Sequence, residues 1–205
     1  MAPMAYARFR EALDRLCVRL NMYLVVINSY SLFLFVVGRV AGFTCLDNRL
    51  YVVYYRRHTI HVYMADTFSE VSVITVDGLQ DPADIIACHD DHQLYVCDRS
   101  GSIWRVLAVN PTDYERWNLP VDESRNNFYN LSLTSLRLVV TARLSHSLCQ
   151  YSTVNRQLLR AIELPDSVRL PTHAVETSRD TFVVSHSQPQ SGVSELLSFF
   201  SCLLV

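Results

Sequence analysis

The chain has 205 residues, half of them hydrophobic, so it is long enough to bury a substantial core and lacks the composition of a disordered protein. Its 18 lysine and arginine residues against 20 aspartate and glutamate residues give a formal net charge of -2, which leaves no basic excess to follow a DNA backbone. The 11 tyrosines, 9 phenylalanines and Val-rich runs predict an all-β core, because aromatic and branched side chains pack well on a pleated surface.

The first segment, residues 1–20, has the pattern of an amphipathic helix. Its apolar residues Tyr6, Phe9, Leu13, Leu16 and Leu20 are three or four positions apart, with charged residues between them. A helix this short either packs on its own domain or pairs with a second chain as a coiled coil. Self-association is therefore left open.

The second segment, residues 21–39, is apolar. No charged residue occurs from Leu20 to Val37, which is just long enough to span a bilayer, although Asn28 and Ser29 are unfavourable in one. The alternatives for residues 20–37 are a pair of buried strands, a membrane-spanning segment and an unfolded piece. Buried strands fit a cytoplasmic protein, and a membrane segment fits a membrane-associated one.

The rest of the chain, residues 40–205, carries a recurrence of 44 residues. Strand-like cores begin at Leu50, Leu94, Leu138 and Phe182. Runs before the cores lie at 43–45, 85–88, 131–133 and 173–175, runs after them at 60–63, 103–106, 148–151 and 193–196, and closing runs at 73–76, 114–119 and 158–164. Four short strands in such a period are typical of a propeller blade.

The prediction is an all-β, β-propeller-like array of about four four-stranded blades behind an N-terminal amphipathic helix. Its units fall at about 40–79, 80–120, 121–165 and 166–205. A β-sandwich and another kind of repeat array are the alternatives. The last unit ends in the apolar run 196–205 without a polar closing strand, so we expect a fragment of a longer product. The alternatives are that the propeller closes by self-association, or that four blades are enough to close it.

The second unit resembles an NHL-type propeller repeat. Its sequence LQDPADIIA at 79–87 followed by LYVCDRSGSIWRV at 94–106 has that family's Pro-led first strand, L-Y-V-x-D core, polar turn and apolar third strand. The other units have Tyr54, Ala142 and His186 near the place of Asp98. The resemblance implies a propeller of about six blades that recruits substrate proteins or RNA, and RNA is a candidate partner through this resemblance alone.

Cysteine usage indicates a reducing compartment. The six cysteines form no C-x-x-C pair, so no zinc knuckle is indicated, and several fall in strand-like apolar runs where a free thiol acts as a small hydrophobic side chain. A secreted or membrane-anchored ectodomain is the alternative, in which Asn130 would carry a glycan.

Motifs for nucleophilic, phosphate-binding or zinc-peptidase chemistry do not occur, and we expect no cofactor and no metal. The cluster at 89–92 has the composition of a solvated turn between strands. A metal-dependent propeller hydrolase or lyase is the enzymatic alternative, with His173, Glu176 and His186 in the fourth unit. The matching positions in the other units are Thr44, Asp84 and Ser132, a poor donor set for a divalent ion.

Aromatic and basic residues of the first two units form the candidate protein-binding surface, because loops on a rigid frame carry recognition residues and Tyr, Trp and Arg are enriched at interface hot spots. These residues are Tyr54, Tyr55, Arg56, Arg57, His58, Trp104 and Arg105. The alternative for Trp104 is packing between blades, and for Arg56 and Arg57 a solvated turn. The prediction is a non-catalytic protein-interaction scaffold with a protein partner.

Overall fold

The fold comes from a computed structural model of the whole chain. It describes residues 39–118, 128–134, 136–142, 146–168, 170–178, 181–187 and 198–204. The predicted helix at 1–20 and nearly all of the apolar segment at 21–39 lie outside the described residues. None of the residues that the structure describes forms a helix able to cross a membrane.

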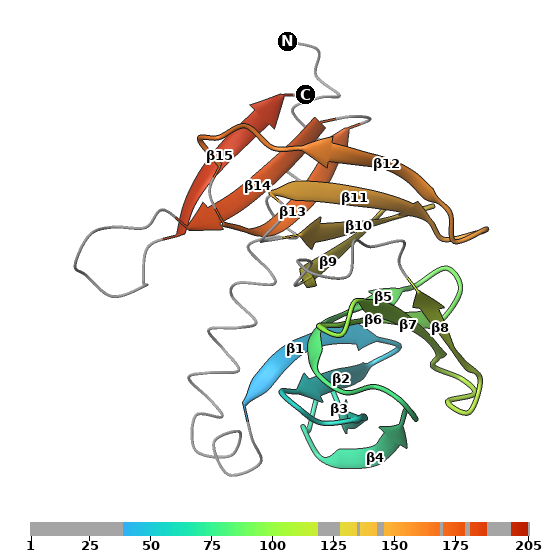
Figure 1. Cartoon of the computed structure of the whole chain (residues 1–205). Coiled ribbons are helices and arrows are strands. Elements are labelled where there is room, and N and C mark those ends of the chain that lie inside the picture. Colours follow the sequence, from blue (N-terminus) through green and yellow to red (C-terminus); the bar gives the residue numbers. More distant parts are fainter. Residues whose placement is uncertain are drawn as a thin grey trace.

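Across the described ranges, fifteen strands make up four antiparallel sheets, each with its strands side by side in chain order (Figure 1). The first sheet contains β1 (Val40–Leu46), β2 (Arg49–Tyr54), β3 (Thr59–Met64) and β4 (Glu70–Thr75). The second contains β5 (Pro82–Cys88), β6 (Gln93–Asp98), β7 (Ser102–Leu107) and β8 (Tyr114–Asn118). The third contains β9 (Phe128–Thr134), β10 (Arg137–Ala142), β11 (Ser147–Ser152) and β12 (Leu158–Glu163), and the fourth β13 (Pro171–Ser178), β14 (Thr181–Ser187) and β15 (Ser198–Leu204).

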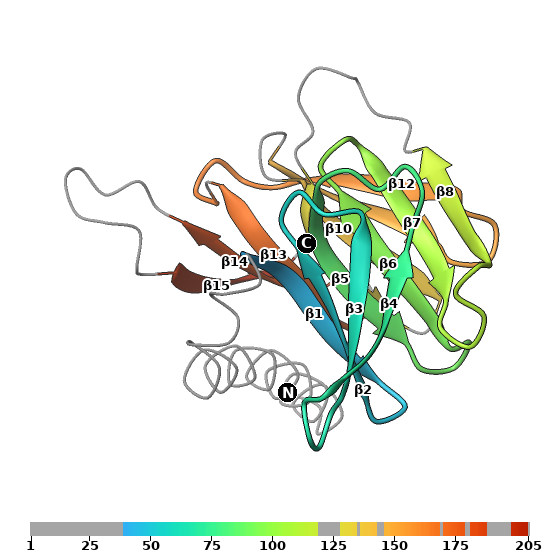
Figure 2. The same cartoon turned by 90° about the horizontal axis from the view of Figure 1, so that it is seen from below.

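The sheets meet through their first strands. β1 contacts β5, β5 contacts β9, and β9 contacts β13, so each first strand is innermost and each later strand lies further out. Figure 2 shows the same arrangement from below, with β1 and β5 side by side. This is the radial order of propeller blades, and the predicted all-β array of about four blades is confirmed.

The recurrence of 44 residues corresponds to equivalent positions in the four sheets. Leu50, Leu94, Leu138 and Phe182 are each the second residue of the second strand, β2, β6, β10 and β14. All four side chains are buried. The repeat in the sequence therefore reflects one buried position that each blade needs for packing against its neighbours.

The third strand of the fourth sheet differs from the prediction. The run 193–196 was expected to pair with the core at 182–185, but the strand that pairs with β14 is β15, in which Leu204 lies opposite Thr181 and Ser198 opposite Ser187. Residues 193–196 lie outside the described part of the chain. Strand pairing constrains which residues alternate but not how many residues connect two strands, which explains why spacing alone predicted the wrong partner for β14.

A close approach joins the first two blades. A Cβ on Gly42 would lie 2.7 Å from Asp84 Oδ1 and 3.0 Å from the Ile85 nitrogen, so only glycine fits where β1 passes β5. The buried Asp84 carboxylate accepts hydrogen bonds from the Ile85 and Leu131 amides, each at 2.9 Å. One carboxylate thus ties β5 to β9.

Further polar contacts link the innermost strands in order. The hydroxyl of Thr44 on β1 accepts a hydrogen bond from the Ala87 amide on β5 at 3.1 Å, and the Asn130 side-chain amide on β9 donates to the carbonyl of Thr172 near the start of β13. Apolar clusters fill the space outside these strands, as where Val53, Leu79 and Trp104 meet between the first two sheets. The blades are therefore fixed relative to one another by both kinds of contact.

Candidate functional site

The meander topology gives the molecule two faces with different connections. One face, which we call the connector face, carries the β2–β3 and β6–β7 turns, the β4–β5 link and the residues 164–168 that follow β12. The opposite face carries the β1–β2, β3–β4, β5–β6, β7–β8 and β11–β12 turns. Four of the seven predicted binding residues lie in the β2–β3 turn, on the connector face.

The β2–β3 turn presents Tyr55 half-buried and Arg56, Arg57 and His58 exposed. The Arg57 amide donates to the Tyr54 carbonyl at 3.2 Å, which closes the turn. Arg56 has a φ of 57°, in the left-handed region that favours glycine. The turn therefore holds three basic side chains in solvent on a short, hydrogen-bonded loop.

Guanidinium groups from three separate segments gather over the Tyr55 ring. Their central carbons lie 5.0 Å from the ring centroid for Arg56, 5.1 Å for Arg99 and 5.7 Å for Arg39. Arg39 precedes β1, and its backbone carbonyl accepts a hydrogen bond from the Tyr55 amide at 2.8 Å. Arg99 comes from the β6–β7 turn of the second blade. We call Tyr55 with Arg39, Arg56 and Arg99 the Tyr55 cluster.

Asp98 fixes the β6–β7 turn of the second blade, which carries Arg99. Its fully buried carboxylate accepts hydrogen bonds from the amides of Gln80 at 2.8 Å, Ser100 at 2.8 Å and Asp81 at 3.4 Å. Arg99 follows directly and donates to the Asp81 carboxylate at 3.1 Å. The Asp at this position thus joins the link before the blade to the turn that carries Arg99.

The remaining predicted binding residues lie away from this surface. The Tyr54 side chain is fully buried, and its hydroxyl lies 3.2 Å from that of Tyr63. Trp104 is buried too, with Gly78 close enough that an added Cβ would lie 3.1 Å from the indole. The exposed part of the predicted surface therefore consists of the β2–β3 turn residues.

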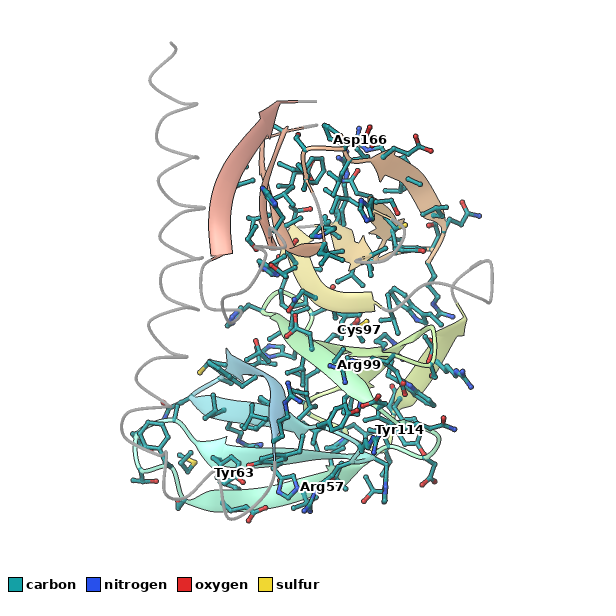
Figure 3. The ribbon with its side chains drawn as sticks, turned by 60° about the vertical axis from the view of Figure 1, so that its left-hand side comes forward. Arg57, Tyr63, Cys97, Arg99, Tyr114 and Asp166 are labelled. Atoms are coloured by element: carbon teal, nitrogen blue, oxygen red, sulfur yellow. The ribbon has the colours of Figure 1, made fainter. Side chains whose placement is uncertain are left out.

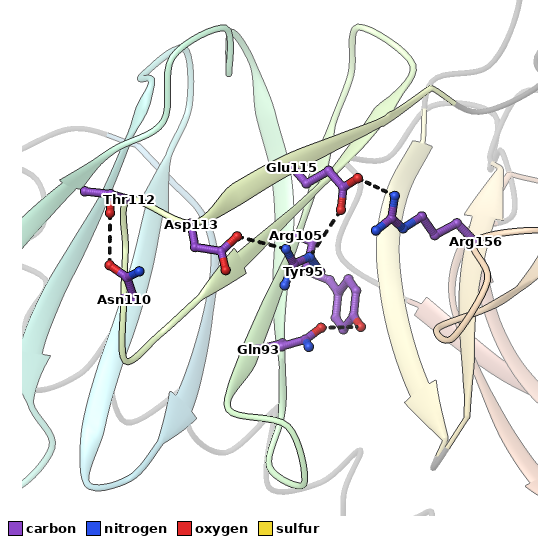
Figure 4. Close-up of polar contacts among 8 residues, drawn as sticks. All are labelled: Gln93, Tyr95, Arg105, Asn110, Thr112, Asp113, Glu115 and Arg156. Atoms are coloured by element: carbon purple, nitrogen blue, oxygen red, sulfur yellow. Dashed lines mark hydrogen bonds and ion pairs between the residues drawn. The ribbon is translucent and has the colours of Figure 1, made fainter.

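Arg105 lies in an ion-pair network beside the opposite face (Figure 4). It donates to Asp113 at 3.0 Å, and its Nε lies 3.5 Å from Glu115 Oε2, which is an ion-pair distance rather than a well-formed hydrogen bond. Glu115 also pairs with Arg156 of the third sheet. The charge of Arg105 is thus neutralised within the molecule, and the network links the second and third blades.

The residues considered for metal binding are dispersed. His92 lies in the β5–β6 turn and pairs with Asp47 of the β1–β2 turn at 2.6 Å. The Glu176 carboxylate accepts hydrogen bonds from Gln150 at 2.9 Å and Arg137 at 3.3 Å. Within the described ranges, no three His, Cys, Asp or Glu side chains come together as a group able to hold a metal.

Two members of the Tyr55 cluster were absent from the prediction, namely Arg39 and Arg99. Figure 3 shows Arg57 on the first sheet and Arg99 on the second, with Asp166 at the far end of the molecule. A signal for Arg99 was available, because it occupies the same turn of the second unit as Arg56 does of the first. Arg39 had no such signal, since it precedes the first repeat.

No family model and no curated protein matches the chain. Among solved structures it is similar to hydrazine synthase from Kuenenia stuttgartiensis, with a TM-score of 0.61 and 15% identity over 74% of this chain and 43% of that chain. The fold is that of a β-propeller.

Propeller domains of two other proteins are similar as well. The domain of Cps50 (Swd1) from Myceliophteria thermophila matches with a TM-score of 0.56 and 9% identity over 78% of this chain and 56% of that chain. The WD40 domain of Doa1 matches with a TM-score of 0.53 and 15% identity over 67% of this chain and 43% of that chain. This β-propeller chain thus spans between 43% and 56% of the length of these structures, and the likeness is one of fold.

Proposed function

We propose that the chain is a non-catalytic protein-interaction scaffold whose connector face binds a protein partner. The observation that carries this proposal is the Tyr55 cluster, in which an aromatic ring and three guanidinium groups from two blades converge at the surface. Tyr and Arg are the side chains most enriched at interface hot spots, and a rigid β-frame lowers the entropy lost on binding.

The chemistry of the cluster supports binding rather than catalysis. Arginine stays protonated in proteins, so Arg39, Arg56 and Arg99 serve as hydrogen-bond donors and fixed charges and not as general acids or bases. Arg57 and His58, exposed beside them, extend the basic surface. We therefore propose an acidic surface on the partner protein.

The finer family assignment is also a proposal. We propose that the second blade is of the NHL type, supported by the L-Y-V-x-D core whose Asp98 ties the Gln80 and Asp81 amides to the following turn. Recruitment of RNA would follow from that assignment alone. The chain charge of -2 favours a protein partner.

A cytoplasmic location is proposed with it. Cys45, Cys88, Cys97 and Cys149 are free thiols, and burial raises the pKa of the Cys97 thiol well above its ordinary value. Such a thiol stays protonated and packs as a small apolar group, as expected of a protein in a reducing compartment.

Site-specific photo-crosslinking in cells tests the proposed surface. A benzophenone side chain is placed at His58 on the connector face or, as the matched control, at Val154, an exposed residue of the β11–β12 turn on the opposite face. We expect one defined protein to crosslink from position 58 and not from 154, and Tyr55→Ala to abolish it. Crosslinking from position 154 in place of 58, or indifference to Tyr55→Ala, would contradict the proposal.

A further inference from the structure

We propose that the Tyr55 cluster is a binding site for the phosphate group of a phosphorylated peptide. This inference rests on the proposed function, since it names the chemistry by which the partner is recognised. The cluster takes the phosphate as a dianion, between guanidinium groups of two blades.

The positions of the three arginines create a local excess of positive charge. Each guanidinium carbon lies between 5.0 and 5.7 Å from one ring centroid, so the three cations are within about a Debye length of one another, ~10 Å at ordinary salt. The negative face of the aromatic ring offsets only part of their mutual repulsion. An anion placed among them offsets the rest.

The charge of the cluster matches a phosphate monoester. Among the described residues, Arg39 and Arg56 have no carboxylate partner, and Arg99 pairs with Asp81. Leaving out the buried Asp98 carboxylate, which accepts three backbone hydrogen bonds, the three guanidinium groups and the Asp81 carboxylate sum to +2. A phosphate monoester carries about −1.5 to −2 at pH 7, whereas a single carboxylate side chain carries half of that.

The hydrogen-bonding capacity of the cluster also fits. A guanidinium that lies over an aromatic ring interacts through its flat face, which leaves its five N–H donors at the edge for other partners. Phosphate offers three strong acceptor oxygens, and arginine forks bind them in pairs with short charge-assisted bonds. The guanidinium carbons of Arg39, Arg56 and Arg99 all lie within 5.7 Å of the Tyr55 ring centroid, so these forks surround one point of the surface before the ligand arrives.

The backbone of Arg56 lies in the left-handed region, where glycine is the least strained residue. Its φ of 57° is a conformation that costs a non-glycine residue on the order of 1 kcal/mol. Glycine would relieve this cost, but it would remove the guanidinium that lies nearest to the Tyr55 centroid. Arg156, in a turn of the opposite face, has the same backbone conformation with a φ of 65°, so the two arginines can be compared directly.

A protein phosphate fits the surface better than an RNA backbone does. RNA binding uses a continuous basic track that neutralises many phosphates, with strong dependence on salt. Here the connector face also carries exposed Asp77 and Asp166, and the whole chain has a net charge of -2. One isolated cluster of three arginines suits one phosphate group.

The test compares two glycine variants of the whole chain. Arg56→Gly removes one guanidinium of the cluster at a left-handed position, and Arg156→Gly is the matched control, because Arg156 is an exposed arginine of the opposite face with a φ of 65°. Both variants keep a favourable turn backbone, so both are expected to fold. Circular dichroism and the melting temperature verify this.

Affinity is measured by fluorescence anisotropy with three versions of one labelled acidic peptide, which carry phosphoserine, serine or glutamate at the central position. We expect the phosphoserine peptide to bind the wild-type chain at least about tenfold more tightly than the other two. Arg56→Gly should lower that affinity about tenfold, and Arg156→Gly should leave it unchanged. Equal affinity for the three peptides, equal effects of the two variants, or displacement of the phosphopeptide by a tighter-binding single-stranded RNA would overturn the inference.

Phosphatase treatment separates this inference from the proposed function. If dephosphorylation of the protein that crosslinks at His58 abolishes its capture, both stand. If capture survives dephosphorylation, the phosphate site is refuted and the scaffold proposal stands. If no protein crosslinks at His58, the scaffold proposal fails, and the peptide titration alone then decides whether the cluster binds phosphate.

Discussion

The two faces of the propeller use charge in different ways. On the opposite face, polar and charged side chains pair between blades, as His92 does with Asp47 at 2.6 Å and Arg156 does with Glu115. On the connector face, Arg39 and Arg56 gather over Tyr55 and have no carboxylate partner among the described residues. Charges that are paired internally hold blades together, whereas cations that converge on one ring are available to an external anion.

The largest expected effect is on the free energy of unfolding, and it differs between two adjacent tyrosines. Tyr54→Ala should lower the free energy of unfolding by about 3–5 kcal/mol, because it empties a fully buried aromatic position. Tyr55→Ala should cost under about 1 kcal/mol and instead abolish partner binding, because Tyr55 is half-buried at the surface. Chemical denaturation and the crosslinking assay measure the two effects, and comparable destabilisation by both variants would show that Tyr55 belongs to the core.

The second effect compares one aspartate from each face. Asp98→Ala should cost about 2–4 kcal/mol, since it leaves the amides of Gln80, Asp81 and Ser100 without their buried acceptor. Asp47→Ala should cost about 0.5 kcal/mol, since the Asp47–His92 pair is half exposed. Urea denaturation of both variants checks the difference, and a small effect at Asp98 would remove its role in placing Arg99.

The third effect is a pH dependence of stability caused by Tyr95, which is buried in the interior between the two faces. Burial raises the pKa of Tyr95 to about 12, with smaller contributions from nearby Cys88 and Asp91. Because the unfolded chain loses this proton near pH 10 and the folded chain keeps it up to about pH 12, stability should be constant below pH 10 and fall by about 3 kcal/mol between the two values.

Denaturation curves from pH 9 to 12 test this, with Tyr95→Phe as the control. The variant loses the hydrogen bond from the Tyr95 hydroxyl to Gln93 at 2.9 Å and should show a weaker fall in stability with pH. Buried Tyr54 and Tyr151 also have raised pKa values, so the fall should not vanish. An identical pH dependence in wild type and variant would contradict the prediction.

The smallest effect concerns the ion pair between the second and third blades. Glu115→Gln should lower stability by less than about 1 kcal/mol, because the Glu115 and Arg156 side chains are both partly exposed and screened by water. The loss should shrink further in high salt. Thermal denaturation at two ionic strengths measures it, and phosphopeptide affinity should be unchanged because the pair lies on the opposite face.

Much of the fold could be predicted from spacing. The cores beginning at Leu50, Leu94 and Leu138 occupy equivalent buried positions, because each blade buries the same strand against its neighbours. The fourth unit was harder, because the strand that pairs with β14 is β15 and residues 188–197 separate the two along the chain. Periodicity predicts which residues face inward and does not determine how far along the chain the partner strand lies.

The candidate site could be predicted only in part. The sequence indicated Tyr55, Arg56 and Arg57 as one turn, but it grouped Tyr54 with them, although β2 is buried on both faces from Leu50 to Tyr54. Arg39 and Arg99 lie 16 residues before and 44 residues after Tyr55 and meet it only through strand pairing and the contact between blades. No local sequence pattern predicts the contact of these two arginines with Tyr55.

The amino-acid sequence by itself determined the all-β class, the repeat and its period, because these depend on which side chains must leave water at regular intervals. Tertiary structure decided which charges are paired and which converge, because that depends on how the sheets lie against one another. A charged residue at a turn has the same local sequence signal whether its neighbour across the blade boundary is a carboxylate or another arginine.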